Sequence, residues 1–157
     1  MVILLHISPA NGDDNPKAWP VSHVEALMNL APEHDYRIVG AEGSAILQNP
    51  KITAVKGTRK ELLDYIDKNV DLVIAIDSWI QHLVALNTSK PMIVLFSRSN
   101  PEIFGHKRSG VINLFESEDY FRSEPFYSWI GERVMPEALV SPEQVARSIG
   151  LLKRRSK

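Results

Sequence analysis

The 157-residue sequence contains no cysteine. Disulfide bonds, thiolate metal sites and a cysteine nucleophile are therefore excluded. No sign of charge dominates, since 18 Lys and Arg stand against 19 Asp and Glu, and the net charge of −1 gives no general support for nucleic-acid binding. Long apolar runs are also absent: Leu72–Ile76 and Pro91–Phe96 are far shorter than the roughly 20 residues of a membrane helix. We expect no nucleic-acid partner and no transmembrane segment.

The length and composition are typical of one folded domain, which we place at residues 1–157. Domains commonly contain about 100 to 200 residues, and the 44% of hydrophobic residues can supply a core. The apolar start Val2–Leu5 has no basic flank and is followed by His6, so we expect no signal peptide and a cytoplasmic location. The basic C-terminal residues could attract anionic lipid and place the protein at the inner membrane, or they could complement the dipole at a helix end. These residues are Lys153, Arg154, Arg155 and Lys157.

Apolar runs alternate with helix signals along the chain. The runs Val2–Ile7, Tyr36–Val39, Ile52–Val55, Leu72–Ile76, Met92–Phe96 and Val111–Phe115 predict strands. The fourth run is apolar at each position, which is typical of a strand covered on both faces. This alternation predicts a three-layer α/β domain of Rossmann-like type with a mostly parallel sheet. Residues 116–136 break the alternation and predict an irregular aromatic segment packed on the domain.

Four helix starts carry capping signals, because Ser, Thr and Asp side chains accept hydrogen bonds from the free N–H groups of a first turn. The signals are Ser22 with Glu25, Thr58 with Glu61, Asp77, and Ser141. In sheets of this class, ligands bind beyond the carboxyl ends of the strands, where helix N-termini favour anions. No Gly-x-Gly-x-x-Gly or Walker loop occurs, so an ordinary dinucleotide or P-loop site lacks its fingerprint.

The helix after Asp77 carries the most informative polar residues. Ser78, Gln81 and His82 lie at i, i+3 and i+4 and form a polar stripe beside the apolar one. Asp77 and Ser78 stand where an anion or a sugar hydroxyl would meet the helix end. Ordinary helix caps with a half-buried histidine would explain the same residues, and both interpretations stay open. The other histidines show no metal-ligand spacing, and no metal site is predicted.

The run from Asp71 to Leu86 resembles a signature of family 9 glycosyltransferases, the lipopolysaccharide heptosyltransferases, in which a strand leads into Asp-Ser/Thr-Gly-x-x-His-Leu-x-Ala-Ala. Further similarities follow in consistent order over nearly the whole chain. They are Lys17-Ala18-Trp19-Pro20, Gly40-Ala41-Glu42, the Pro-led strand at Lys90–Phe96, Asn100-Pro101, Phe104-Gly105, Met135 and Ser141–Val145. The family has the two-domain GT-B fold. The resemblance implies that this chain corresponds to its C-terminal, donor-binding domain.

The resemblance also implies a ligand, a nucleotide-diphospho-sugar of the ADP-heptose kind (an ADP- or UDP-sugar), and no resident cofactor. Lys17 would contact the donor phosphates and Glu42 the ribose. Asp77 and Ser78 would lie at the diphosphate and sugar, and His82 would support their loop. Residues in the loops after the first and fifth predicted strands complete the set, including an arginine that could add a phosphate contact. The predicted donor-binding residues are Ser8, Asn11, Lys17, Glu42, Asp77, Ser78, His82 and Arg98.

Three departures from the family pattern bear on activity. The acceptor-binding domain, which supplies the catalytic base in the family, has no match here, so we assign no catalytic residue and expect transfer to need a separate acceptor-domain chain. Trp79 replaces a glycine that lets the backbone approach the donor, and an indole there could obstruct the phosphates. Ser97-Arg98-Ser99 replaces Gly-Pro-Thr.

Two hypotheses remain open. The chain is the donor-binding half of a glycosyltransferase, or it is a non-catalytic binding or regulatory protein that kept the scaffold and lost donor binding. Whether it is an enzyme and how many copies assemble are questions on which the sequence is silent.

Overall fold

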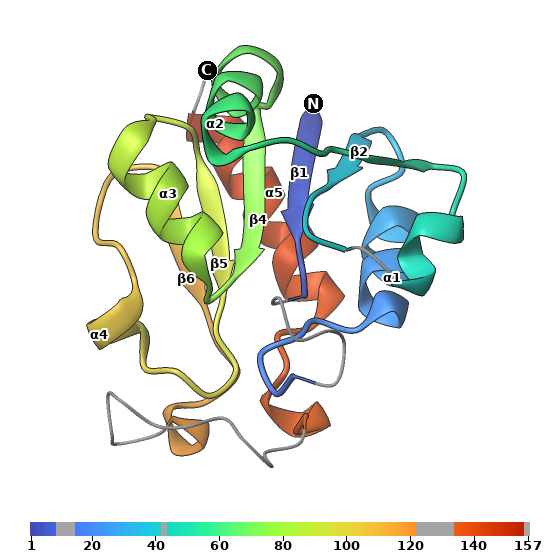
Figure 1. Ribbon diagram of the computed structural model, residues 1–157. Helices are drawn as coiled ribbons and strands as arrows, with labels where there is room; N and C mark the ends of the chain where they lie inside the picture. The colour runs from blue at the N-terminus through green and yellow to red at the C-terminus, as the bar shows by residue number, and fades with distance from the viewer. Residues whose placement is uncertain (9–14, 42–43, 122–133, 156–157) are drawn as a thin grey trace.

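A parallel sheet forms the centre of the molecule, in the strand order β3-β2-β1-β4-β5-β6 (Figure 1). The computed structural model describes residues 1–8, 15–41, 44–121 and 134–155. Within these ranges the strands are β1 (Val2–His6), β2 (Asp35–Ile38), β3 (Ile52–Ala54), β4 (Leu72–Ile76), β5 (Met92–Leu95) and β6 (Val111–Leu114). The α-helices are α1 (Val21–Leu30), α2 (Arg59–Asn69), α3 (Trp79–Asn87), α4 (Pro101–Phe104) and α5 (Pro142–Arg155). Short 3₁₀ helices are η1 (Ala45–Gln48), η2 (Glu118–Tyr120) and η3 (Pro136–Ala138).

The predicted strand pattern and the α/β fold class are confirmed. β4 has the predicted bounds, whereas the other strands end one residue before the apolar runs do. The backbone N–H groups of Val39, Val55 and Phe96 still donate to the neighbouring strand, so the difference lies in how the end of a strand is defined. The short helix α4 and the 3₁₀ helices are additions to the predicted pattern.

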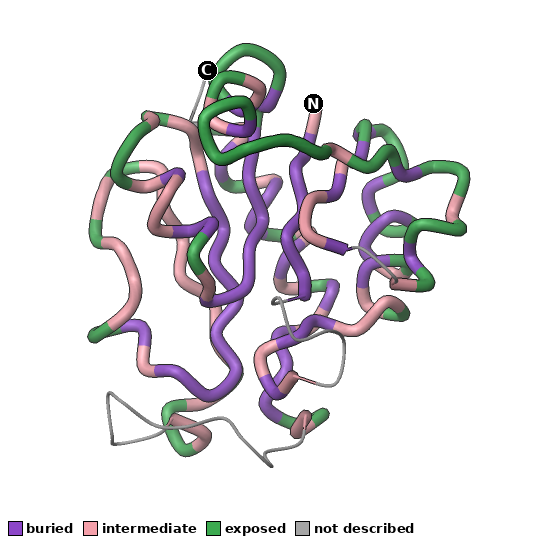
Figure 2. The backbone as a smooth tube through the Cα atoms, in the orientation of Figure 1, coloured by how far each residue is buried: buried purple, intermediate pink, exposed green. Residues whose placement is uncertain are grey.

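Side-chain alternation along the strands divides the core into two apolar layers. In β1, Ile3 and Leu5 join the layer covered by α1 and α5, whereas Leu4 joins the layer covered by α2 and α3 (Figure 1). β4 is buried at each residue, as its continuous apolar sequence predicts for a strand covered on both faces. Figure 2 shows the consequence: the central strands β1, β4 and β5 are buried almost throughout, and the exposed residues gather on the outer turns of the helices and in the loops.

Two of the predicted helix caps are wrong. Ser22 lies inside α1, whose N-cap position is Pro20 and has no side-chain cap. Asp77 lies one residue before the N-cap position of α3, which Ser78 occupies without a side-chain cap hydrogen bond. Two other caps are confirmed: Thr58 and Glu61 form a reciprocal capping box on α2, and the Ser141 hydroxyl accepts the N–H of Gln144 at 3.3 Å in the first turn of α5.

Trp19 anchors the loop between β1 and α1. Its indole Nε1 donates to the Val140 carbonyl at 2.8 Å, and its ring lies edge-on to His23 of α1. The backbone N–H of Trp19 also donates to the Ile7 carbonyl at 2.8 Å. The loop is thereby held against both the end of β1 and the segment that leads into α5, which fixes the position of its neighbour Lys17.

The outer segments of the chain are described only in part. Of the predicted irregular segment 116–136, the 3₁₀ helices η2 and η3 are described, and residues 122–133 lie outside the described ranges. In the basic tail, Lys153 forms an ion pair with Glu33 at 3.1 Å, and attraction to lipid stays a prediction. No helix within the described ranges has the length and apolar character needed to cross a membrane.

Replacing Thr58 with Ala should lower the free energy of unfolding by about 1 kcal/mol, because the first turn of α2 would lose its side-chain acceptor. Thr58→Ser keeps the hydroxyl and should retain most of the stability. Urea denaturation followed by circular dichroism measures both variants. Equal stability of Thr58→Ala and the wild type would show that this cap contributes nothing.

Candidate functional site

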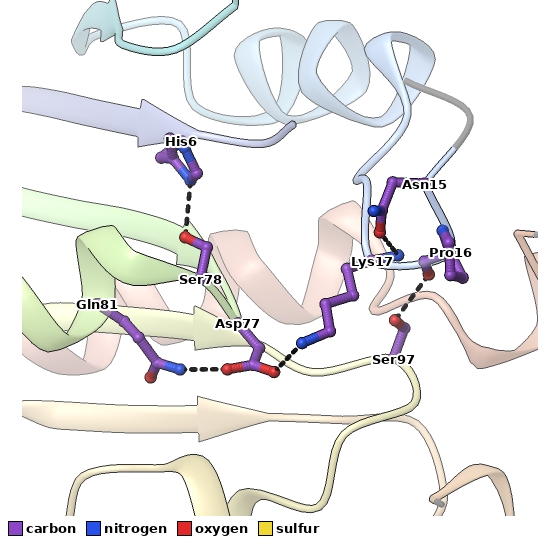
Figure 3. Close-up of polar contacts among 8 residues, drawn as sticks. All are labelled: His6, Asn15, Pro16, Lys17, Asp77, Ser78, Gln81 and Ser97. Carbon is purple, nitrogen blue, oxygen red and sulfur yellow. Dashed lines mark hydrogen bonds and ion pairs between the residues drawn. The ribbon is translucent and has the colours of Figure 1, made fainter. Parts of the chain in front are cut away.

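The strand order reverses next to β1, because β2 and β3 lie on one side of it and β4, β5 and β6 on the other. In doubly wound sheets, ligands bind in the crevice at this reversal, beyond the carboxyl ends of the strands. His6 ends β1, while Asp77 and Ser78 follow β4 and lead into α3. Figure 3 shows Lys17, from the loop after β1, reaching across to Asp77. The crevice therefore combines a helix N-terminus with side chains from three segments.

A lysine–aspartate ion pair lies at this edge of the sheet. Lys17 Nζ lies 2.7 Å from Asp77 Oδ2, with side-chain exposures of 20% and 6%. The other oxygen, Oδ1, accepts a hydrogen bond from Gln81 Nε2 at 2.5 Å (Figure 3). Both carboxylate oxygens thus have donors, as a buried charge requires. The Asp77 carboxylate holds the ammonium of Lys17 at the carboxyl edge of the sheet, beside the N-terminus of α3.

Gln81 is a buried polar side chain that uses only part of its hydrogen-bonding capacity. It is fully buried, and its Oε1 has no hydrogen-bond partner among the described residues. Its nitrogen is committed to Asp77. The stripe of Ser78, Gln81 and His82 is therefore divided in the structure, with each side chain facing a different partner.

The second side of the crevice is built around His6, which the sequence interpretation left out of the site. His6 is almost fully buried, and its Nδ1 lies 3.0 Å from Ser78 Oγ. The Trp79 ring lies edge-on to the imidazole, with centroids 6.1 Å apart. Gly40 has a positive φ of 69°, and a Cβ there would lie 3.1 Å from the His6 ring. Glycine at this position allows the backbone after β2 to approach the imidazole.

One feature of the sequence could have indicated that His6 belongs to the site: it is a polar residue at the carboxyl end of an apolar strand. Its Ser78 partner is 72 residues away in the sequence, so the contact follows from the parallel pairing of β1 with β4 rather than from any local spacing.

Serine and arginine side chains after β5 hold loops together. Ser97 Oγ donates to the Pro16 carbonyl at 3.0 Å, which ties the β5 loop to the segment that carries Lys17 (Figure 3). Arg98 is buried, and its Nε donates to the Tyr120 carbonyl at 3.2 Å while its Nη1 lies 2.7 Å from Met135 Sδ. The Arg98 guanidinium thus contacts one residue before and one residue after the range 122–133. Its phosphate contact stays a prediction.

His82 faces the loop after α4. Its Nδ1 lies 2.9 Å from His106 Nε2, so one ring nitrogen donates and the other accepts. Burial lowers the pKa of His106 below its ordinary value of 6.5, and the neighbouring His82 and Arg108 lower it further. The pair thus favours a neutral His106. Gly105 allows this arrangement, since a Cβ there would lie 2.4 Å from the Pro101 carbonyl oxygen.

The structure therefore brings Lys17, Asp77 and Ser78 to one crevice, with Ser8 buried directly after β1. Asn11 and Glu42 lie outside the described residues. Among the residues that are described, no three His, Asp or Glu side chains come together as a metal site. The arrangement that remains is suited to an anion, because a helix N-terminus without a side-chain cap lies beside a lysine.

The fold is that of a doubly wound parallel α/β domain, and these polar side chains lie at the reversal of strand order, where such folds bind ligands. No family model matches the chain, and no curated protein matches it by sequence. Solved structures do match by fold. A family 9 glycosyltransferase of Veillonella parvula DSM 2008 has a TM-score of 0.68 at 17% identity and covers 97% of this chain. E. coli ADP-heptose lipopolysaccharide heptosyltransferase II has a TM-score of 0.70 at 13% identity over 99% of this chain.

A third match is an E. coli heptosyltransferase solved with ADP, with a TM-score of 0.66 at 14% identity over 96% of this chain. The chain spans only 43–47% of the length of these three structures. The predicted resemblance to family 9 is thereby confirmed at the level of the fold, which is that of one half of a GT-B glycosyltransferase.

Breaking the Lys17–Asp77 pair should destabilise the fold. We expect Lys17→Met to cost roughly 2 kcal/mol, because the Asp77 carboxylate would stay buried with one donor fewer. The double variant Lys17→Met/Asp77→Asn should cost less than the sum of the single variants, by about 1 kcal/mol or more. Denaturant titrations of the four proteins give the coupling energy.

A matched control is the exposed pair Lys153–Glu33, whose lysine can also be changed to Met. Its side-chain exposures are 39% and 60%, so we expect a loss of about 0–1 kcal/mol. Strict additivity in the Lys17/Asp77 cycle would contradict the proposed pairing.

The His82–His106 contact predicts a stability that depends on pH. The pKa of His106 is lowered in the folded state. Neutral His106 therefore contributes to stability above the ordinary pKa of 6.5, and this stability is lost as pH falls through the folded-state pKa. Urea titrations at pH 7 and pH 5.5 should therefore show a smaller pH-dependent loss for His106→Gln than for the wild type. Identical losses in the two proteins would contradict this assignment.

Proposed function

We propose that this domain binds a nucleoside-diphosphate sugar, of the ADP-heptose kind, with the diphosphate at the N-terminus of α3. The observation that carries the proposal is the Lys17 ammonium held 2.7 Å from Asp77 beside that helix end. Backbone N–H groups and a lysine are the partners that phosphates commonly find in proteins. The fold adds support, since one of its structural neighbours is named for ADP-heptose and another was solved with ADP.

Sugar transfer would need more than these residues. The diphosphate is the leaving group of glycosyl transfer, and a helix N-terminus can stabilise the charge that develops on it. The described residues would stabilise the leaving group, which is one half of the chemistry. The chain spans less than half the length of its structural neighbours. We therefore propose that the acceptor site and its base come from an acceptor domain outside these 157 residues.

A second candidate is a non-catalytic binding or regulatory protein that kept the scaffold and lost donor binding. Two observations favour it. Asp77 already neutralises Lys17, and Trp79, which is 40% exposed, occupies the first position of the helix that would receive the diphosphate. The two candidates differ in whether nucleotide binds.

Calorimetric titration of the purified protein with ADP, UDP and their sugars should show saturable binding. Lys17→Met should weaken it roughly 10- to 100-fold, since a charge-assisted contact to phosphate is lost. Lys68→Met removes an exposed lysine at the last turn of α2 and should leave the affinity unchanged. An absence of binding at millimolar nucleotide, from a folded sample, would reject donor binding in favour of the second candidate.

A further inference from the structure

An exposed tryptophan borders the candidate site. Trp79 is the first residue of α3 and is 40% exposed, although it is one of the largest apolar side chains in the protein. Its ring is held edge-on by His6, at an interplanar angle of 73°. The guanidinium of Arg59, from the start of α2, lies 5.4 Å from the centroid of the indole. The side chain is therefore fixed in position while a large part of its surface faces solvent.

The contacts of the indole place it on one particular side of the crevice. His6, which it touches, packs against Gly40 at the end of β2. Arg59, which it also touches, begins the helix that follows β3. Lys17 and Asp77 form the ion pair on the other side, where β4 ends. Trp79 thus lies toward the β1–β2–β3 half of the sheet, beside the place proposed for the diphosphate.

In the doubly wound sheets that bind dinucleotides, an acidic residue on this half of the sheet binds the ribose, which places the nucleoside on this side of the reversal. An exposed indole stacks well on a nucleobase, because each base has a π face. The Arg59 guanidinium lies over the indole ring, and its charge is complementary to the negative charge of a nucleotide. The Arg59–Trp79 pair therefore matches both parts of a nucleoside diphosphate, the aromatic base and the anionic chain.

We propose that Trp79, braced by His6 and Arg59, is the stacking platform for the nucleobase of the donor. The inference rests on the proposed function, and it names the residue that selects a nucleotide over a simple polyphosphate. It also reverses the expectation that an indole at this position obstructs the phosphates. Restoring the glycine of the family pattern should accordingly impair the site.

The test compares ADP with inorganic pyrophosphate, which has no base. For Trp79→Gly we expect ADP binding to weaken roughly 5- to 150-fold, the range measured for loss of base stacking, while pyrophosphate binding stays the same. Trp79→Phe keeps an aromatic face and should retain most of the ADP affinity, which separates stacking from any weakening of α3. Leu86→Ala, at the exposed far end of α3, should change neither affinity.

One result would overturn the platform and leave the proposed function standing: a wild type that binds ADP and a Trp79→Gly variant that binds it as well or better. A wild type that binds no ADP while Trp79→Gly does would overturn both, since the indole would then be an obstruction that has abolished donor binding. If neither protein binds ADP or pyrophosphate, the proposed function itself is rejected and the platform with it.

Discussion

A carboxylate cannot stay charged inside a protein unless donors surround it, and the arrangement of the candidate site follows from that constraint at Asp77. Its two oxygens accept one hydrogen bond from Gln81, in the helix that follows it, and one from Lys17. The second partner is 60 residues away in the sequence. Satisfying one buried charge therefore draws the loop after β1 across the end of β4 and closes the crevice on that side.

The loop that carries Lys17 is itself held by neutral contacts. Trp19 donates to the Val140 carbonyl, and Ser97 donates to the Pro16 carbonyl. These bonds join the loops after β1 and β5 with the segment before α5. A lysine has a long and flexible side chain, so an ion pair of defined geometry needs a backbone that is already fixed. The ion pair and the loop contacts thus depend on one another.

Local patterns in the sequence were sufficient to predict the sheet. Strands that are buried on both faces are continuous apolar runs, and the runs between turn residues were few and distinct. The same local logic predicted the cap at Thr58, where Glu61 lies within one turn and both side chains are exposed. It failed at Asp77, because a tertiary partner competed for the carboxylate. It also failed at Ser22, because α1 begins one residue earlier and Pro20 holds its N-cap position.

The candidate site was predictable in its location more than in its contacts. The carboxyl edge of a parallel sheet is fixed by topology, which is why Lys17, Asp77 and Ser78 meet there. His6 was missed because its contact with Ser78 exists only through the pairing of β1 with β4. The same holds for His82, whose partner His106 comes from the loop after α4.

The charge balance of the crevice bears on how any diphosphate is held. Lys17 is shared with Asp77, so its attraction for an anion is partly cancelled at the point where phosphate would approach. Affinity must then come from groups that the aspartate does not neutralise. The backbone N–H groups at the start of α3 are one such source, and the Arg59–Trp79 pair on the opposite side is another. If the proposed donor binds here, a site whose lysine is held by a carboxylate, and which has a tryptophan in place of the glycine of the resembled family pattern, would depend on the base as much as on the phosphates.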